Sequence, residues 1–369
     1  MKDFELPRGE ACEPGIIVID KPRGLTSNQV LSRVRRLAGQ KKVGYAGTLD
    51  PMATGLLIFA VGKATKLLQY LSAHDKAYLA RVRFGMATDT DDSEGAVTSA
   101  LGAEGLTIER VESALAAYRG EIQQVPSTYS AIKVDGKRAY DLARRGEEVE
   151  LKARTVTISK LELLPFWPVP NGKNLPTGTG QNGKNEGSVA QRSTDSQVTL
   201  DVDLLVECSA GTYVRALARD LGRDLGCGAH LTALRRIRVG DYALDSAKTL
   251  DDLAAEVEKN GKIQVKTLDE ALLSTFPPLE VDETQARALS FGQSIRISNP
   301  PQITDNERGQ RFAAHAPLGS VVALVEMATN PVDDLGEEDT TPKSKPANQE
   351  AKTAKPVWVL HPHGSQNHE

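Results

Sequence analysis

The stretch GYAGTLDPMATGLL, residues 44–57, is the segment around which we expect the rest of the fold to be organised. It sets one carboxylate, Asp50, among three glycines and a proline. Glycine and proline at this density predict a tightly bent backbone, and such loops often present a side chain to a ligand. Residues 56–61 are apolar enough for a buried strand, so we expect Asp50 beside that strand.

An aspartate before a proline is an ordinary turn former, and Asp50 taken alone would be interpreted as a turn residue. The wider pattern Gly-x-x-Gly-Thr-Leu-Asp-Pro-x-Ala-Thr-Gly-Leu-Leu instead resembles the catalytic loop of the TruB family of tRNA pseudouridine synthases. The resemblance implies that Asp50 is the catalytic aspartate. This chain departs from the family at Tyr45, where TruB proteins usually carry histidine, and the resemblance places Tyr45 among the substrate-binding residues.

Two later motifs extend the resemblance. Lys76-Ala-Tyr78 opens an alternating strand, and Tyr78 alone would be interpreted as a packed strand aromatic. Gly-Thr-Tyr213-Val-Arg215 begins a helix, where a cation faces the positive end of the helix dipole. A carboxylate partner would offset this, although the spacing alone favours an exposed arginine. The resemblance implies that Tyr78 is a catalytic residue, which stacks on the target base and takes part in removing the proton from its carbon 5. It also implies that Arg215 pairs with the catalytic aspartate, and that Lys76, Tyr213 and Leu234 line the substrate site.

Residues 126–152 form a further motif, in which cations alternate with tyrosines. Basic side chains can contact phosphates, and tyrosine rings can stack on unpaired bases. Composition alone is equally compatible with a surface helix-turn. The order of residues resembles the TruB thumb loop, which implies contacts with the T arm of tRNA through Lys133, Lys137, Arg144 and Arg145.

The net charge of −4 does not indicate a nucleic-acid partner, but the charges are unevenly distributed. Residues 21–49 hold seven basic side chains and no acidic one, and residues 215–238 hold six arginines. Two basic runs beside the candidate chemistry favour phosphate contacts over a merely solvated face. Residues 87–95 are the densest acidic stretch, and we predict a solvated turn there, because the spacing fails for a calcium loop.

The chain has 369 residues, of which 40% are hydrophobic and 25% charged, as expected for a globular protein. No apolar run reaches the roughly 20 residues of a membrane helix, and the first residues lack a signal-peptide pattern, so we expect a cytoplasmic protein. The three cysteines, at 12, 208 and 227, indicate neither disulfides nor a zinc site. We expect no metal, no cofactor and a monomer.

The predicted fold class is α+β. The resemblance implies a pseudouridine synthase fold, with a mixed, mainly antiparallel central sheet flanked by helices, followed by a small PUA-like β domain. We predict a catalytic domain over residues 1–247 with a low-complexity insertion at 168–197, and a helical linker over 248–275. The PUA-like domain is predicted over 276–363, with a disordered insertion at 328–355.

The predicted function is isomerisation of uridine to pseudouridine at position 55, in the T loop of tRNA. The residues leave two alternatives open. A tRNA-binding or folding factor would need the basic faces and not Asp50. A glycosidase-like hydrolase would use Asp50 with Asp92 or Glu94 and would release free uracil.

Overall fold

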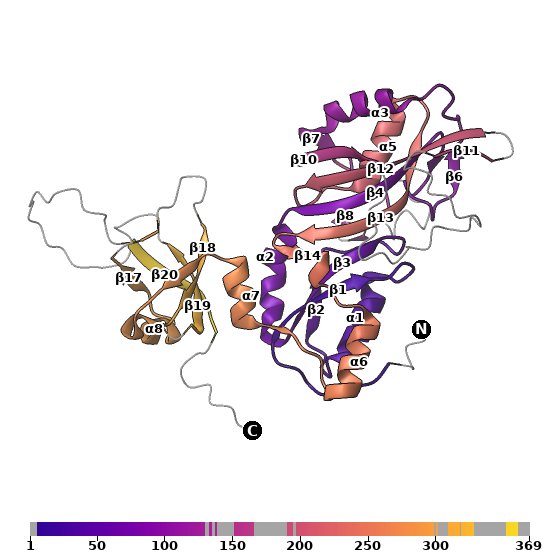
Figure 1. Ribbon diagram of the computed structural model, residues 1–369. Coiled ribbons are helices and arrows are strands. Elements are labelled where there is room, and N and C mark those ends of the chain that lie inside the picture. The colour runs from indigo at the N-terminus through magenta and orange to yellow at the C-terminus, as the bar shows by residue number, and fades with distance from the viewer. Residues whose placement is uncertain are drawn as a thin grey trace, which may run out of the picture. The chain divides into compact units, whose positions relative to one another are not determined.

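The computed structural model describes residues 6–129, 133–134, 137–138, 151–165, 190–194, 197–298, 300–301, 309–317, 319–327 and 352–360. The chain divides into two compact units, Met1–Val265 and Lys266–Glu369 (Figure 1). This boundary falls inside the predicted linker. Among the described residues, no helix combines the length and the apolar character needed to cross a membrane.

The first unit is built on a sheet in which β1, β3, β13, β4, β12, β10 and β7 follow one another, with β2 beside β3, β14 beside β13 and β11 beside β12. Only β3 and β13 pair in parallel, and the other described pairs of this sheet are antiparallel. The predicted mixed, mainly antiparallel sheet is therefore confirmed. The strands are β1 (Gly15–Lys21), β2 (Val43–Ala46), β3 (Thr54–Val61), β4 (Lys76–Phe84), β7 (Gly120–Gln124), β10 (Arg154–Leu164), β11 (Ala190–Thr194), β12 (Gln197–Cys208), β13 (Ala229–Val239) and β14 (Tyr242–Ala243).

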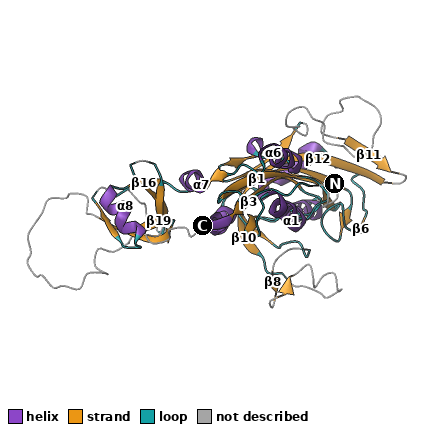
Figure 2. Ribbon diagram, turned by 90° about the horizontal axis from the view of Figure 1, so that it is seen from below, coloured by secondary structure: helices purple, strands orange, loops and turns teal. Residues whose placement is uncertain are grey.

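Helices cover this sheet, and α1 and α6 lie beside β1 and β3 in both views (Figures 1 and 2). The α-helices of the unit are α1 (Ser27–Leu37), α2 (Leu68–Ala73), α3 (Ile108–Leu115), α5 (Val214–Asp224) and α6 (Leu250–Asn260). Thr26 caps α1 in a capping box with Gln29. A 3₁₀ turn, Gly62–Leu67, leads directly into α2. Further 3₁₀ turns are Ala116–Tyr118 and Leu244–Ser246, and short hairpins join β5 (Ala87–Thr88) to β6 (Val97–Ser99) and β8 (Lys133–Val134) to β9 (Lys137–Arg138).

Burial explains the residue patterns of the central strands. All eight residues of β3 are buried, so a continuous apolar run is required there. In β4, Tyr78 and its alternate neighbours join the core, while Arg81 and Arg83 point to the other face. There they form ion pairs of 2.7 Å with Asp203 and Asp201, their register partners on β12.

The second unit holds a five-stranded sheet in the order β16-β18-β19-β20-β17, with its own apolar core. The strands of this sheet are β16 (Pro278–Glu280), β17 (Ile295–Ile297), β18 (Arg311–His315), β19 (Val321–Met327) and β20 (Lys352–Val359). The unit also holds the two-residue strand β15 (Lys266–Thr267) and the helices α7 (Leu268–Thr275) and α8 (Glu283–Ser290). The small C-terminal β domain is thus confirmed. β20 begins at Lys352, inside the insertion predicted over residues 328–355, and the sequence did not predict β18 or α8.

Candidate active site

The predicted loop of residues 44–57 is shorter than expected. Strand β2 extends to Ala46 and β3 begins at Thr54, so only residues 47–53 are irregular. Asp50 lies in the middle of this segment, directly before the buried strand β3, as predicted.

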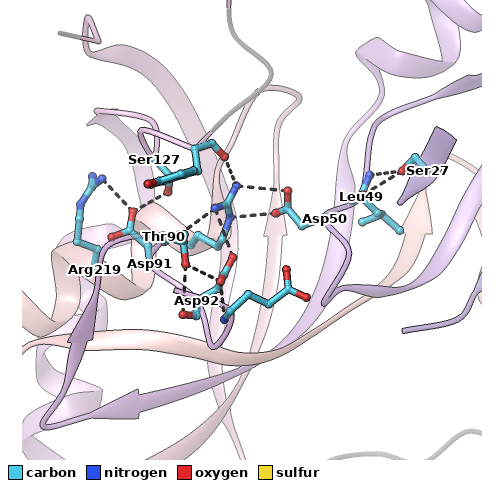
Figure 3. A network of polar contacts seen from close by, with 11 residues as sticks. Ser27, Leu49, Asp50, Thr90, Asp91, Asp92, Ser127 and Arg219 are labelled. Atoms are coloured by element: carbon cyan, nitrogen blue, oxygen red, sulfur yellow. Dashed lines mark hydrogen bonds and ion pairs between the residues drawn. The ribbon is translucent and has the colours of Figure 1, made fainter. Parts of the chain in front are cut away.

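Hydrogen bonds hold the loop on both sides of Asp50. The Ser27 hydroxyl donates to the Leu49 carbonyl and accepts from the Leu49 amide, both at 3.0 Å (Figure 3). On the other side, the Gly24 amide donates to the Pro51 carbonyl at 2.8 Å. The start of α1 therefore fixes the backbone on which Asp50 is carried.

Lys21 also serves this loop, and not a phosphate as its place in the basic run suggested. Its side chain is fully buried, and its ammonium donates to the carbonyls of Pro22, Leu25 and Pro51 at 3.0, 2.6 and 3.3 Å. Burial lowers the pKa of Lys21 to about 8, and the charge of Asp50 opposes this shift. Lys21 is a structural cation beneath the loop.

Arg215 lies in the first turn of α5, and it meets Asp50 as predicted. Its Nε lies 2.9 Å from Asp50 Oδ2, and its Nη2 lies 3.3 Å from Oδ1, so the two side chains pair through both oxygens. The Asp50 side chain is 35% exposed and that of Arg215 only 5%. The carboxylate therefore remains accessible to a substrate, while the guanidinium lies behind it.

The acidic stretch after β4 is not the solvated turn that we predicted. Asp91 and Asp92 are buried, at 7% and 3% exposure. Asp92 lies 3.4 Å from Arg215 Nη1, and Asp91 accepts from the Ser127 hydroxyl at 2.7 Å and pairs with Arg219 at 3.3 Å (Figure 3). The burial could not be inferred from the sequence, because the arginines that pair with both carboxylates, Arg215 and Arg219, come from far along the chain.

Backbone groups complete the surroundings of Arg215. Its Nη1 donates to the Thr90 carbonyl and its Nη2 to the Tyr129 carbonyl, both at 2.8 Å. Arg215 therefore joins the Asp50 loop, the turn after β4 and the first residues of the predicted thumb loop.

The electrostatics of Asp50 combine opposing effects. Burial raises the pKa of its carboxyl above the ordinary 3.8, and the nearby charge of Asp92 raises it further. Arg215 and Lys21 act in the opposite direction. The net shift is upward, because the effect of burial outweighs the lowering of the pKa of Asp50 by Arg215.

Tyr78 and Leu234 lie on adjacent strands in the same core cluster, each 7% exposed. Burial raises the pKa of the Tyr78 phenol, and Arg236 opposes that shift by its charge. Arg236 was not singled out from the sequence. The signal that could have drawn attention to it is the adjacent pair Arg235-Arg236 in the middle of strand β13.

The remaining predicted residues have different surroundings. The Tyr45 ring packs against Phe59 at 5.8 Å between centroids, and its hydroxyl donates to Asn28 Oδ1 at 3.1 Å. Tyr213 is the N-cap residue of α5, half-buried, with its backbone held by the Gln124 amide. The Lys76 ammonium donates to the carbonyls of Ser72 and His74 at the end of α2, and burial lowers its pKa to about 8.

The predicted thumb contacts lie outside the described side chains. Lys133 and Lys137 are described only as residues of the β8–β9 hairpin, and Arg144 and Arg145 are not described. Within the described part of the chain, no group of three or more His, Cys, Asp or Glu side chains is arranged to hold a metal ion.

Comparison with known proteins identifies the family. Residues 35–171 match the model of the TruB family pseudouridylate synthase N-terminal domain, and residues 215–280 match that of the tRNA pseudouridylate synthase B C-terminal domain. A protein of Arthrobacter sp. (strain FB24) named tRNA pseudouridine synthase B is 46% identical over 314 residues, covering 84% of this chain and 92% of that relative. A protein of Thermobifida fusca (strain YX) with the same name is 44% identical over 312 residues, covering 85% and 94%. The chain belongs to the TruB family.

Solved structures agree at the level of the fold. An H/ACA RNP bound to a substrate RNA containing 2'-deoxyuridine contains a chain with a TM-score of 0.60 and 21% identity, covering 94% of this chain and 86% of that one. A Cbf5-Nop10-Gar1 complex gives a TM-score of 0.59 at 23% identity, covering 88% and 86%. At identities of 21% and 23%, these two matches establish that the chain has the pseudouridine synthase fold.

The position of Ser27 leads to a test of how the Asp50 loop is held. Ser27→Ala removes a buried hydroxyl, and the backbone amide and carbonyl of Leu49 then lose their hydrogen-bond partner. We expect it to lower the free energy of unfolding by about 1–3 kcal/mol. Ser32→Ala is the matched control, because the Ser32 hydroxyl bonds the Asn28 carbonyl on the exposed face of the same helix. Chemical denaturation should give a change within about 0.5 kcal/mol for the control, and equal effects would contradict the role of Ser27.

Proposed function

We propose that this chain isomerises uridine to pseudouridine in tRNA, at the T-loop uridine at position 55, with Asp50 as nucleophile and Arg215 as its partner. The observation that carries the proposal is the two-point contact between an accessible carboxylate and a buried guanidinium within the TruB motif loop. Relatives named tRNA pseudouridine synthase B support the reaction and the RNA class.

The reaction accounts for the kinds of residue at the site. The N1–C1' bond of the target uridine breaks and a C5–C1' bond forms, while the hydrogen on C5 leaves as a proton and N1 gains one. The base is the same in composition before and after, so no net oxidant or reductant is consumed. Asp50 in its ionised form attacks the target nucleotide, and Arg215 orients the carboxylate and stabilises its negative charge.

The residues around Asp50 suit an unpaired base. To reach the carboxylate, the target nucleotide must leave its stack, and an aromatic ring can then replace the lost stacking. We assign this stacking to Tyr78, with Leu234 on the adjacent strand. Because burial raises the pKa of the Tyr78 phenol, the ring is neutral near pH 7, which favours stacking and hydrogen bonding over proton abstraction.

The tRNA contacts are assigned by position along the chain. Arg215 bonds the Tyr129 carbonyl, so the catalytic pair is connected to the start of the segment that resembles the thumb loop. Lys133, Lys137, Arg144 and Arg145 belong to that segment. We propose that they contact phosphates of the T stem-loop.

Asp50→Asn tests the proposal directly. We expect pseudouridine formation to fall by about a thousandfold or more, because the nucleophile is removed, while tRNA affinity stays within about tenfold, because the phosphate contacts remain. The measurement is single-turnover conversion of one unmodified tRNA with mapping of the product position. Asp245→Asn, at an exposed aspartate, is the control.

The other outcomes separate the alternatives. Undiminished turnover in Asp50→Asn would remove Asp50 from the mechanism. A wild-type protein that binds tRNA without modifying it would be a binding factor. Release of free uracil would identify a hydrolase, and pseudouridine at another position would correct the target.

The raised pKa of Asp50 predicts a pH dependence. The ionised carboxylate is the active form, so the single-turnover rate constant should fall about tenfold per pH unit once the pH drops below the pKa of Asp50. Because that pKa lies above 3.8, the fall should begin at a higher pH than for an ordinary aspartate. Asp92→Asn removes a charge that raises this pKa, so it should move the acid limb to lower pH. A limb that stays in place or moves upward would contradict the coupling.

Tyr45 provides a test of the family's usual histidine position. Its ring packs on Phe59, which favours an aromatic, space-filling role over proton transfer, for which histidine but not a phenol is suited near neutrality. We expect Tyr45→His and Tyr45→Phe to change the single-turnover rate by less than about tenfold, which is about 1.4 kcal/mol in barrier height, and Tyr45→Ala to cost more. A native protein that is inactive and is activated by Tyr45→His would establish an ionisable role instead.

A further inference from the structure

Arg236 is a buried cation that contacts the Asp50 loop from β13. Its side chain is 1% exposed. The guanidinium Nε donates to the Leu56 carbonyl at 2.7 Å, and Nη2 donates to the Gly47 carbonyl at 2.8 Å. Gly47 precedes Asp50 and Leu56 follows it, so one planar group holds both ends of the segment that carries the proposed nucleophile.

The glycines of the motif are explained by the same arginine. Gly47 has φ +70°, and a Cβ there would lie 3.1 Å from Arg236 Nη1. Gly55 has φ +98° and pairs with Arg236 in parallel register, and a Cβ there would lie 2.2 Å from the Arg236 carbonyl oxygen. Both positions favour glycine for two reasons. The backbone has a positive φ, and a Cβ would meet the side chain of Arg236 at residue 47 and its backbone at residue 55.

Arg236 also contacts the second functional side chain. It is the register partner of Tyr78 across β13 and β4, and its charge counteracts the burial that raises the pKa of the Tyr78 phenol. The Asp50 loop and Tyr78 are therefore connected through one residue, although they belong to different strands.

A purely structural role explains the burial less well. A buried guanidinium loses much of its hydration energy, and within the described residues Arg236 has no carboxylate within 4 Å to compensate. An apolar side chain of similar volume would avoid that cost, but it would leave the Gly47 and Leu56 carbonyls without this donor. What the guanidinium adds is a rigid fork that reaches several acceptors at fixed angles.

We propose that Arg236 is a positioning residue, which sets the Asp50 loop and the Tyr78 ring at a fixed separation, so that both meet the target nucleotide in one geometry. The inference rests on the proposed function, because it assigns a task to the same two side chains. It adds a residue that touches neither the substrate nor the carboxylate.

Arg236→Lys is the main test, because lysine keeps the charge but cannot reach both carbonyls from one nitrogen. Arg238→Lys is the matched control, since Arg238 lies on the same strand, is 36% exposed and pairs with Glu207 at 2.6 Å. Single-turnover experiments on one unmodified tRNA give a rate constant, an amplitude and an affinity. For Arg236→Lys we expect a rate constant about a hundredfold lower, with amplitude and affinity within about threefold, as a misplaced group would give. The control should stay within about twofold in all three.

The amplitude distinguishes positioning from folding. If Arg236 only stabilises the fold, fewer Arg236→Lys molecules should be folded. The amplitude of pseudouridine formation should then fall, while the rate constant of the folded molecules stays unchanged. That result would overturn the inference. An active wild type with an unchanged rate constant in Arg236→Lys would overturn it as well, while a wild type that forms no pseudouridine would defeat the proposed function itself.

Gly47→Ala keeps the test decisive if Arg236→Lys does not fold. It pushes the loop away from Arg236 without removing the buried charge. Gly105→Ala is its control, because Gly105 has a similar φ of +71° and nothing within 4 Å of its would-be Cβ. We expect a rate constant at least about tenfold lower for Gly47→Ala, by the same misplacement argument, and no change for Gly105→Ala. Equal rate constants in the two variants would overturn the inference.

Discussion

The guanidinium of Arg215 is the interaction on which the site depends. An arginine has five N–H groups, and Arg215 makes five polar contacts, two to Asp50 and one each to Asp92, Thr90 and Tyr129. A cation at the start of α5 is unfavourable, because the helix dipole is positive there. The two carboxylates offset this cost, so the helix, the Asp50 loop and the turn after β4 stabilise one another.

A second constraint is the irregular backbone of residues 47–53. Its carbonyls lie next to a fully buried strand, where unpaired polar groups are costly. Side chains from outside the loop satisfy them: Ser27 bonds Leu49, Lys21 bonds Pro51 and Arg236 bonds Gly47. Two of these three side chains are cations, and in a dry environment their hydrogen bonds to carbonyls are strong. The backbone bearing Asp50 is thereby fixed before any substrate arrives.

These two constraints leave a carboxylate that is rigidly held and yet accessible. The positive charges around it are engaged in holding protein groups, and most of them do not face the solvent. Of the seven basic residues in the run over residues 21–49, Lys21 is fully buried and Arg33 is 9% exposed, whereas the other five are exposed and remain candidates for RNA contacts. The buried cations that contact the loop, Lys21, Arg215 and Arg236, stabilise its conformation.

The sequence by itself determined the family, the α+β class and the positions of the central strands, and the resemblance of its motifs implied that Asp50 and Arg215 are partners. It could do so because these properties follow from local patterns: apolar periodicity, glycine spacing and the order of short motifs. It could not determine that Asp91 and Asp92 are buried, that Lys21 is a structural cation, or that Arg236 bonds the loop. Each of these involves at least one partner that is distant in sequence, such as Arg219 for Asp91, Pro51 for Lys21 or Gly47 for Arg236. Charge patterns record which residues are polar, whereas burial and pairing are decided only when the strands and helices pack together.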